Sequence, residues 1–236
     1  MTRTHLSPAG LDLNYRWMTA VARLVCRVVI GDLLDIAGTE RVPPRGGLLV
    51  VCNHVGGADP PVTGAYMPRR DVYFMAKSDY FRSPISRFFI VGYHAFPVVR
   101  GTADRAALRQ AVGLMRQGHA VVVYPEGHRS PDGVLQRPHP GAGFLARAAG
   151  VPILPVGIWG TERALPLGSI RPRHAPVHLR FGRAAPLPPE NPEGPRRSNQ
   201  EVSDLLMERI AEVLPLSRRG IFDGTTDYRA VPPPTA

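Results

Sequence analysis

The stretch 48–59, LLVVCNHVGGAD, decides how the rest of the chain is interpreted. Its first five residues are apolar without alternation, which is typical of a strand buried on both faces of a parallel sheet. His54 follows close to the end of this strand, and Asp59 comes five residues later. In open α/β sheets, ligands and catalytic groups collect in the loops at the carboxyl ends of strands. The stretch therefore predicts both an α/β fold and the place of its active site.

His54 and Asp59 form a candidate catalytic pair. Gly56 and Gly57 let the backbone turn tightly, so the Asp59 carboxylate can come back toward the His54 imidazole. A carboxylate on one ring nitrogen fixes the tautomer and leaves the other nitrogen free to remove a proton from a hydroxyl group. Asp59 followed by two prolines also fits a helix N-cap, a purely structural role. The two roles are compatible, because a carboxylate accepts several hydrogen bonds.

Length and composition limit the class of protein. The chain has 236 residues, 44% of them hydrophobic, which is enough for one sizeable core, and no linker divides it, so we expect a single domain. The net charge of +10 indicates an anionic partner. Nucleic acid, a phospholipid surface and a phosphorylated substrate all fit this charge, and the sequence contains no recognised nucleic-acid-binding motif. Cysteine and histidine spacing predicts neither a disulfide framework nor a metal site.

Alternating strands and helices are predicted along the chain. Apolar or β-branched runs mark further strands at 71–76, 92–100, 120–124, 151–159 and 176–181. Capping signals and helical periodicity mark helices at 59–67, 83–92, 102–118, 141–149 and 198–213, with Thr102 and Ser198 as caps. This order favours right-handed βαβ units in one mostly parallel sheet flanked by helices. The last strand alternates apolar and polar residues, as expected nearer an edge.

An amphipathic helix is predicted before the sheet, from Leu13 to Leu34, with Arg16, Arg23 and Arg27 between its apolar residues. The pattern fits a helix packed on the core and a helix lying in a membrane interface equally well. No apolar stretch approaches the roughly 20 residues needed to span a bilayer, and no secretory signal precedes the helix. We therefore expect peripheral contact with the cytoplasmic face of the cell membrane.

Three segments follow from these patterns. Residues 1–35 form the N-terminal amphipathic helix, residues 36–215 form the catalytic domain, and residues 216–236 form a flexible, proline-rich tail. The prolines at 232–234, at the end of this segment, are the signal for the tail.

Charged residues that follow the predicted strands are candidates for substrate binding. Lys77 is the only lysine in the chain and follows a strand, which suits a phosphate contact, although one lysine at this position also fits chance. Arg100 enters the loop after the next strand and is well placed to hold an anion. Glu126 and Arg129 lie in the loop PEGHRS, residues 125–130, where they either hold substrate or pair with each other.

Four sequence blocks together resemble the glycerophospholipid acyltransferases, the group that contains 1-acylglycerol-3-phosphate acyltransferase. The blocks are NHVGGAD at 53–59, GYHAFPVVR at 92–100, YPEGHRS at 124–130 and VPILPV at 151–156. Their order and spacing are similar to the family pattern over roughly residues 36–187. Four blocks in register are far more specific than any single one.

The resemblance implies roles for individual residues. In the first block, His54 and Asp59 correspond to the catalytic pair of the family. The second and third blocks imply an acceptor site for glycerol phosphate at Arg100, Glu126, Gly127 and Arg129, with Lys77 as a further phosphate contact. The chain departs from the family pattern at Gly56, at His128 and near His139. These departures lie in the loops that would recognise the acceptor head group.

The implied activity is transfer of a fatty acyl group from acyl-CoA or acyl carrier protein, as co-substrate without a cofactor, to a lysophospholipid hydroxyl. The first expectation is 1-acylglycerol-3-phosphate giving phosphatidic acid, at an anionic membrane surface. His54 would remove the hydroxyl proton, Asp59 would orient the imidazole, and backbone N–H groups at 55–58 would hold the oxyanion. Another lyso-lipid or hydroxylated acceptor, or a thioester hydrolase using the same pair, stays open as an alternative.

Overall fold

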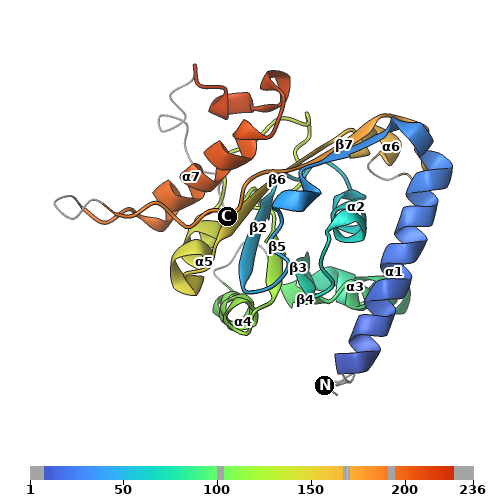
Figure 1. Ribbon diagram of the computed structural model, residues 1–236, viewed down its shortest axis with the longest axis horizontal. Coiled ribbons are helices and arrows are strands. Elements are labelled where there is room, and N and C mark those ends of the chain that lie inside the picture. Colours follow the sequence, from blue (N-terminus) through green and yellow to red (C-terminus); the bar gives the residue numbers. More distant parts are fainter. Residues whose placement is uncertain (1–7, 100–103, 167–168, 170, 191–194, 226–236) are drawn as a thin grey trace.

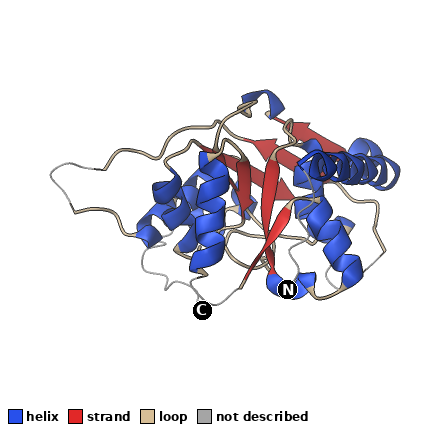
Figure 2. Ribbon diagram, turned by 90° about the horizontal axis from the view of Figure 1, so that it is seen from below, coloured by secondary structure: helices blue, strands red, loops and turns tan. Residues whose placement is uncertain are grey.

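A seven-stranded sheet lies between two layers of helices (Figures 1 and 2). The computed structural model describes residues 8–99, 104–166, 169, 171–190 and 195–225, with side chains from Leu13 onward. The strands are β1 Leu34–Ala37, β2 Leu48–Cys52, β3 Val72–Lys77, β4 Ala95–Val98, β5 Ala120–Val123, β6 Ile153–Trp159 and β7 Val177–Phe181. Their order is β1-β7-β6-β2-β5-β3-β4, and only β6 and β7 pair antiparallel. The predicted α/β fold with a mostly parallel sheet is confirmed.

The helices divide between the two faces of the sheet. Their bounds are α1 Pro8–Val29, α2 Asp59–Tyr66, α3 Pro84–Gly92, α4 Arg105–Arg116, α5 Gly141–Ala149, α6 Thr161–Ala164 and α7 Asn199–Glu212. One face carries α1, α2 and α3, and the other carries α4, α5 and α7 (Figure 1). Short 3₁₀ turns lie at 31–33, 39–41, 78–81, 216–218 and 220–222.

β2 is buried on both faces, which explains its unbroken apolar sequence. Leu48, Val50 and Cys52 belong to the core under α1 and α2. Leu49 and Val51 belong to the core under α4, α5 and α7. All five side chains are fully buried, and burial of each of the four leucine and valine side chains stabilises the fold by about 1.5 to 3 kcal/mol. The strand that leads to His54 is therefore the rigid centre of the sheet.

The parallel strands β2, β5, β3 and β4 are neighbours, so their carboxyl ends meet at one edge. His54 follows β2, Glu126 follows β5, and Lys77 ends β3 at this edge. Arg100 follows β4 but lies outside the described residues. The sheet order thus brings the predicted catalytic and binding loops together, as expected for a parallel sheet.

The N-terminal helix ends earlier in the chain than predicted, and the sheet gains a strand that the sequence analysis missed. α1 ends at Val29, and β1 begins at Leu34. Gly31, between them, has a left-handed φ of +57°, which an α-helix cannot continue and which glycine adopts without steric cost. Leu34 and Ile36 prolong the apolar pattern of the helix, but they belong to a half-exposed edge strand paired with β7. The predicted helix is therefore wrong at its C-terminal end.

The segment after residue 216 is attached more firmly than predicted. Phe222 is buried, and Nη2 of Arg218 lies 3.0 Å from Oε1 of Glu162. The backbone carbonyl of Arg218 also accepts a hydrogen bond from the N–H of Leu135 at 2.9 Å. The prediction of a flexible tail is wrong for 216–225, because these contacts hold it on the domain. Residues 226–236 lie outside the described part of the chain.

Two helix starts test the predicted caps. Ser198 and Glu201 form the predicted capping box at the start of α7. Thr102 lies outside the described residues, and Asp104 caps α4 instead by accepting a hydrogen bond from the N–H of Ala107 at 3.0 Å. Aspartate is as good a cap as threonine, so sequence signals at neighbouring positions compete.

Candidate active site

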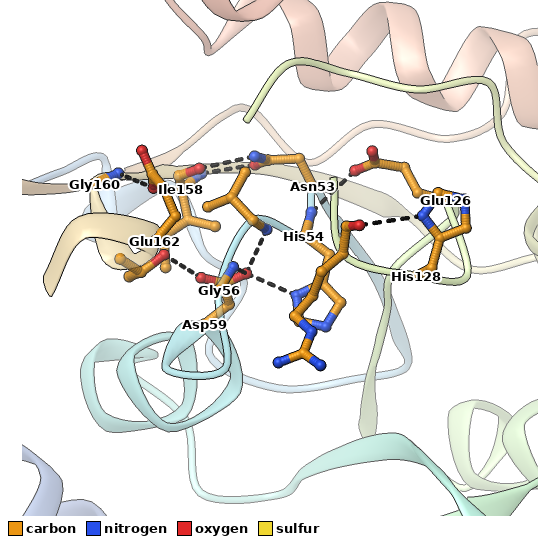
Figure 3. A network of polar contacts seen from close by, with 12 residues as sticks. Asn53, His54, Gly56, Asp59, Glu126, His128, Ile158, Gly160 and Glu162 are labelled. Carbon is orange, nitrogen blue, oxygen red and sulfur yellow. Dashed lines mark hydrogen bonds and ion pairs between the residues drawn. The ribbon is translucent and has the colours of Figure 1, made fainter. Parts of the chain in front are cut away.

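Asp59 brings its carboxylate back to His54, as predicted (Figure 3). Nδ1 of His54 lies 2.7 Å from Oδ2 of Asp59, and the two residues are 7% and 0% exposed. A carboxylate at Nδ1 keeps a proton on that nitrogen and leaves Nε2 as an acceptor. Nε2 has no hydrogen-bond partner among the residues that the structure describes. The imidazole is therefore oriented to act as a general base.

The other hydrogen bonds of Asp59 shape the loop. Oδ2 also accepts from the N–H of Val55 at 2.7 Å and of Gly56 at 2.8 Å. Oδ1 accepts from the hydroxyl of Thr161, the first residue of α6. Asp59 is the first residue of α2, and its carboxylate does not cap that helix. The helix-cap alternative is therefore wrong, because the carboxylate bonds the preceding loop.

The hydrogen bonds of Asp59 reduce the number of backbone N–H groups at 55–58 that are available to bind an oxyanion. The N–H groups of Val55 and Gly56 already donate to Asp59, so they are not free to bind an oxyanion. In the part of the loop from 55 to 58, the remaining N–H groups are those of Gly57 and Ala58, which have no described acceptor. Any stabilisation of an oxyanion by this loop rests on these two groups.

Glu126 uses both carboxylate oxygens to hold backbone groups, one of them the N–H of His54. Oε1 accepts from the N–H of His54 at 3.0 Å, and Oε2 accepts from the N–H of Gln136 at 3.1 Å. The N–H of Ser130 donates to the carbonyl of His54 at 2.7 Å. Glu126 is fully buried, and burial raises its pKa to about 8. The expectation that Glu126 binds the acceptor does not fit this geometry, since both oxygens bond backbone groups.

Two residues that the sequence analysis missed complete the surroundings of the pair. The ring of Tyr124 stacks on His54 with centroids 4.3 Å apart. Burial raises the pKa of Tyr124 well above its usual value, so its hydroxyl stays neutral. Asn53 pairs with β6 through both amide atoms, donating to the carbonyl of Ile158 and accepting from its N–H, each at 2.8 Å. Asn53 thus extends the pairing of β2 with β6 up to the residue before His54.

Gly127 and Arg129 lie in the loop after β5. Gly127 has a left-handed φ of +71°, and a Cβ atom there would lie 2.6 Å from Cδ2 of His139, so only glycine fits. A Cβ atom added at Gly57 would lie 3.6 Å from Nη1 of Arg129, which places this guanidinium beside the catalytic loop. Arg129 forms no side-chain hydrogen bond or ion pair with a described residue, Glu126 included. The alternative in which Glu126 and Arg129 pair is therefore wrong.

The structure gives less support for the predicted phosphate contacts of Lys77 and Arg100. Nζ of Lys77 lies 2.6 Å from Oδ2 of Asp79, and both side chains are nearly half exposed. The hydrogen bond from Lys77 lowers the pKa of Asp79, so the lysine charge is partly compensated within its own loop. The prediction for Arg100 falls outside the described residues. The structure therefore brings His54, Asp59 and Arg129 together and leaves these two contacts as predictions.

Comparison with known proteins identifies the family. A family model described as Acyltransferase matches residues 34–159, which is more than half of the chain and begins at β1. The chain belongs to the acyltransferase family. The match covers β1 to β6, and it includes His54, Asp59 and Glu126.

Similar proteins have names that agree with this family. The 1-acyl-sn-glycerol-3-phosphate acyltransferase of Bacillus subtilis strain 168 is 28% identical over 128 residues, which is 54% of this chain and 63% of that protein. The protein of the same name from Chlamydomonas reinhardtii is 27% identical over 188 residues, 77% of this chain and 53% of its own length. The chain thus spans between half and two thirds of these relatives.

A solved structure shares the fold. The 1-acyl-sn-glycerophosphate (LPA) acyltransferase PlsC from Thermotoga maritima superimposes with a TM-score of 0.66 over 86% of this chain and 78% of that one, at 24% sequence identity. This likeness supports the α/β architecture, in which a helix precedes a mostly parallel sheet flanked by helices. It says nothing by itself about the substrate of this chain.

Proposed function

We propose that the protein transfers a fatty acyl group from an acyl thioester, on coenzyme A or acyl carrier protein, to the hydroxyl of a lysophospholipid. The observation that carries the proposal is the His54–Asp59 pair, which leaves Nε2 of His54 without a described partner at the carboxyl edge of the sheet. The names of the relatives support 1-acyl-sn-glycerol-3-phosphate as the first acceptor to test.

The chemistry needs one base and one oxyanion site. Nε2 of His54 takes the proton of the acceptor hydroxyl while its oxygen attacks the thioester carbonyl carbon. The tetrahedral intermediate collapses, the C–S bond breaks, and the leaving thiolate takes the proton back from the imidazolium. Asp59 stabilises that imidazolium through Nδ1. The N–H groups of Gly57 and Ala58 donate hydrogen bonds to the oxyanion. The base contributes about a hundred- to ten-thousand-fold to such a reaction.

Arg129 is the best-supported contact for the acceptor phosphate. Its guanidinium lies beside the catalytic loop at Gly57 and has no acidic partner among the described residues. A planar guanidinium binds a phosphate through two parallel hydrogen bonds, which fixes the orientation of the acceptor. We keep Lys77 and Arg100 as further proposed contacts at the same edge. Both Glu126 oxygens already accept backbone hydrogen bonds, so we assign Glu126 to supporting the loop, and we keep Gly127 as a further proposed contact at the acceptor site.

We also propose that the protein works at the cytoplasmic face of the membrane, held there peripherally by α1 and α3. In the described part of the chain, none of the helices is both long and apolar enough to cross a bilayer. The outer face of α1 nevertheless exposes these apolar side chains by 42% to 76%: Leu13, Trp17, Val21, Leu24, Val25 and Val28. On α3, the exposed ones are Ile85, Phe88 and Phe89.

These two apolar surfaces belong to adjacent helices. Met18 of α1 packs against Gly92 of α3, and the hydroxyl of Tyr93 donates to the carbonyl of Met18 at 3.1 Å. α3 begins after the turn that follows Lys77, at the edge that carries His54. A bilayer bound by α1 and α3 therefore lies next to the active site, which suits a lipid acceptor and a long acyl chain.

The decisive experiment incubates the purified protein with long-chain acyl-CoA or acyl carrier protein and a panel of lysolipids, with products identified by mass spectrometry. We expect acylation of lysophosphatidate by the parent and loss of transfer in His54→Ala. His178→Ala, which alters another histidine bonded to an aspartate, serves as the matched control and should keep full activity. Thioester consumption without an acylated lipid would identify a hydrolase instead.

The same assay tests the acceptor contact. Arg129→Ala should raise KM for lysophosphatidate by the equivalent of about 1.5 to 3 kcal/mol, the worth of a hydrogen bond to a charged group, with little change in KM for the donor. Arg163→Ala, an exposed arginine of α6, is the control for loss of charge. A rise in KM for the donor alone would show that Arg129 binds the thioester carrier and not the acceptor.

A further inference from the structure

A cavity of about 330 Å³ lies between α1 and the C-terminal end of α2, away from the catalytic pair. Its walls come from the middle of α1, from Gly64 of α2 and from the connection 67–70 that leads into β3. This connection precedes β3, so the cavity lies toward the amino edge of the sheet. His54 lies at the carboxyl edge, and the proposed acyl transfer makes no use of the cavity.

The lining of the cavity is strongly basic. It contains Arg16, Arg23, Arg69 and Arg70, and it contains no acidic residue. Arg69 is a structural residue, because its buried guanidinium bonds the carboxylate of Asp71 and the carbonyls of Pro43 and Gly118. The other three arginines have no acidic partner among the described residues. Three uncompensated charges around one cavity favour binding of an anion.

The donors of these arginines are mostly unused. Nε of Arg23 donates to the carbonyl of Ala65 at 2.5 Å, which leaves its two terminal nitrogens. Arg16 and Arg70 are exposed and form no side-chain hydrogen bond with a described residue. The C-terminal carbonyls of α2 would repel an anion. Those of Gly64 and Ala65 are already bonded by the hydroxyl of Tyr15 and by Arg23, which removes part of this repulsion.

The position of the arginines on α1 indicates where the anion comes from. At 100° per residue, the inner face of α1 carries Tyr15, Thr19, Cys26 and Ile30, which are all buried. A stripe made of Arg16, Arg23 and Arg27 runs directly beside it. The exposed apolar face that contains Leu13, Trp17 and Leu24 lies on the far side of this stripe. The cavity therefore opens along the border of the apolar face.

We propose that this arginine cavity binds the phosphate group of an anionic phospholipid, as a second lipid site separate from the catalytic one. An apolar face buried at the acyl boundary places the neighbouring arginines at the depth of the head groups. A phosphate of the bilayer then reaches Arg16, Arg23 and Arg70 without leaving its leaflet. The proposal rests on the proposed membrane association and is independent of the identity of the acyl acceptor.

The test compares single arginine variants on two kinds of vesicle. Phosphatidylcholine vesicles carry either phosphatidate or oleate, adjusted to the same surface charge, so that only the chemistry of the anion differs. Arg16→Gln and Arg70→Gln remove cavity arginines. Arg27→Gln removes the same charge from the same stripe but outside the cavity, and it is the matched control. All three side chains are exposed, so melting temperatures should agree with the parent.

Arg27→Gln should weaken binding about fivefold on both vesicles, the effect of one charge near an anionic surface. The cavity variants should weaken binding about fivefold on oleate vesicles, and about tenfold beyond that on phosphatidate vesicles because they lose a charge-assisted hydrogen bond. Equal losses for all variants on both vesicles would overturn the site and leave only a diffuse basic stripe.

A second arm separates a lipid from a free phosphate. Glycerol 3-phosphate is added to the protein without vesicles, and the melting temperature is followed for the parent and for Arg16→Gln. No difference between the two chains supports the head group as the ligand. A stabilisation that Arg16→Gln loses would show that the cavity takes a soluble phosphate, which overturns the lipid source. Neither arm requires turnover, so failure here is distinct from failure of the acyl-transfer proposal.

Discussion

The catalytic loop after β2 and the outer face of α1 differ in where their side chains find partners. In the loop, the carboxylate of Asp59 has four described hydrogen bonds, and the backbone of His54 is held at both its N–H and its carbonyl. On α1, Trp17 and Val28 are 66% and 76% exposed and contact little of their own chain. The loop is therefore held by partners within the protein, whereas the outer face of α1 is left exposed, which is the observation behind the proposed membrane contact.

This difference separates two uses of the same fold. A general base needs one orientation, which internal hydrogen bonds from several elements provide before substrate arrives. A surface that meets a bilayer needs apolar area and no fixed geometry. Substitutions in the loop should therefore change both activity and stability, while substitutions on the helix face should leave the folded chain almost unchanged. Three experiments test how sharply the two regions differ.

The largest effect is expected for Asp59→Asn. The amide keeps the size of the side chain but places an NH₂ group among the N–H donors of the loop, and it no longer fixes the proton on Nδ1 of His54. Acyl transfer should fall about a hundred- to ten-thousand-fold, the share of a general base. The melting temperature should fall as well. Asp35→Asn removes the carboxylate of an exposed aspartate–histidine pair and should keep full activity; equal losses would show that the catalytic role lies elsewhere.

A smaller, pH-dependent effect is expected at Glu126. Burial raises its folded pKa to about 8 from an ordinary value of 4.5. Between these values the folded chain keeps a proton that the unfolded chain has lost, so raising the pH favours unfolding. The contribution of Glu126 to stability is fully present below about pH 4.5 and is lost as the pH rises through about 8, at up to about 1.4 kcal/mol per unit.

Glu126→Gln removes this titration, so the difference between the parent and the variant isolates the contribution of Glu126 from that of all other titrating groups. The free energy of unfolding, measured by denaturant at several pH values between 5 and 9, should fall more steeply with pH in the parent than in Glu126→Gln. Any cost of placing an amide beside the N–H groups of His54 and Gln136 is the same at every pH. Parallel curves would show that the buried carboxyl does not titrate in this range.

The smallest effect is expected for Trp17→Ser on the outer face of α1. This side chain is 66% exposed, so the free energy of unfolding should change by less than about 0.5 kcal/mol. Tyr15→Ser on the inner face of the same helix is the contrasting variant. Its side chain is 1% exposed and donates to the carbonyl of Gly64, so its loss should cost about 3 to 5 kcal/mol. Similar melting temperatures for the two variants would contradict the division of α1 into two faces.

The sequence was most informative where partners are close along the chain. β2, the return of Asp59 to His54 and the capping box at Ser198 all depend on residues within a few positions of one another. Thr161 bonds Asp59 from 102 positions away, and no local pattern could identify it. β1 was missed for the same reason, because its partner β7 lies near the other end of the chain.

α1 shows why apolar periodicity can locate a helix correctly without showing which of its faces is buried. Periodicity located the helix, but the stripe containing Trp17, Leu24 and Val28 is exposed, so the core-packing alternative is wrong for that stripe. The buried face instead uses Tyr15 and Cys26, together with the hydroxyl of Thr19 bonded to the helix backbone. A helix with two faces that avoid charge gives a hydropathy pattern that cannot distinguish inside from outside.

The pairing of β1 with β7 has a consequence for how the chain is made. Leu34 pairs with Val177, and Ala37 pairs with Arg180, so the first strand in the described part of the chain pairs with the last one, which is synthesised much later. Contacts of such long sequence separation form late, because the loop between them must close first. Until residue 181 has been synthesised, β1 has no neighbour in the sheet. During that interval the outer apolar face of α1, which precedes β1 in the sequence, has already been synthesised, so the proposed membrane contact can form before the sheet is complete.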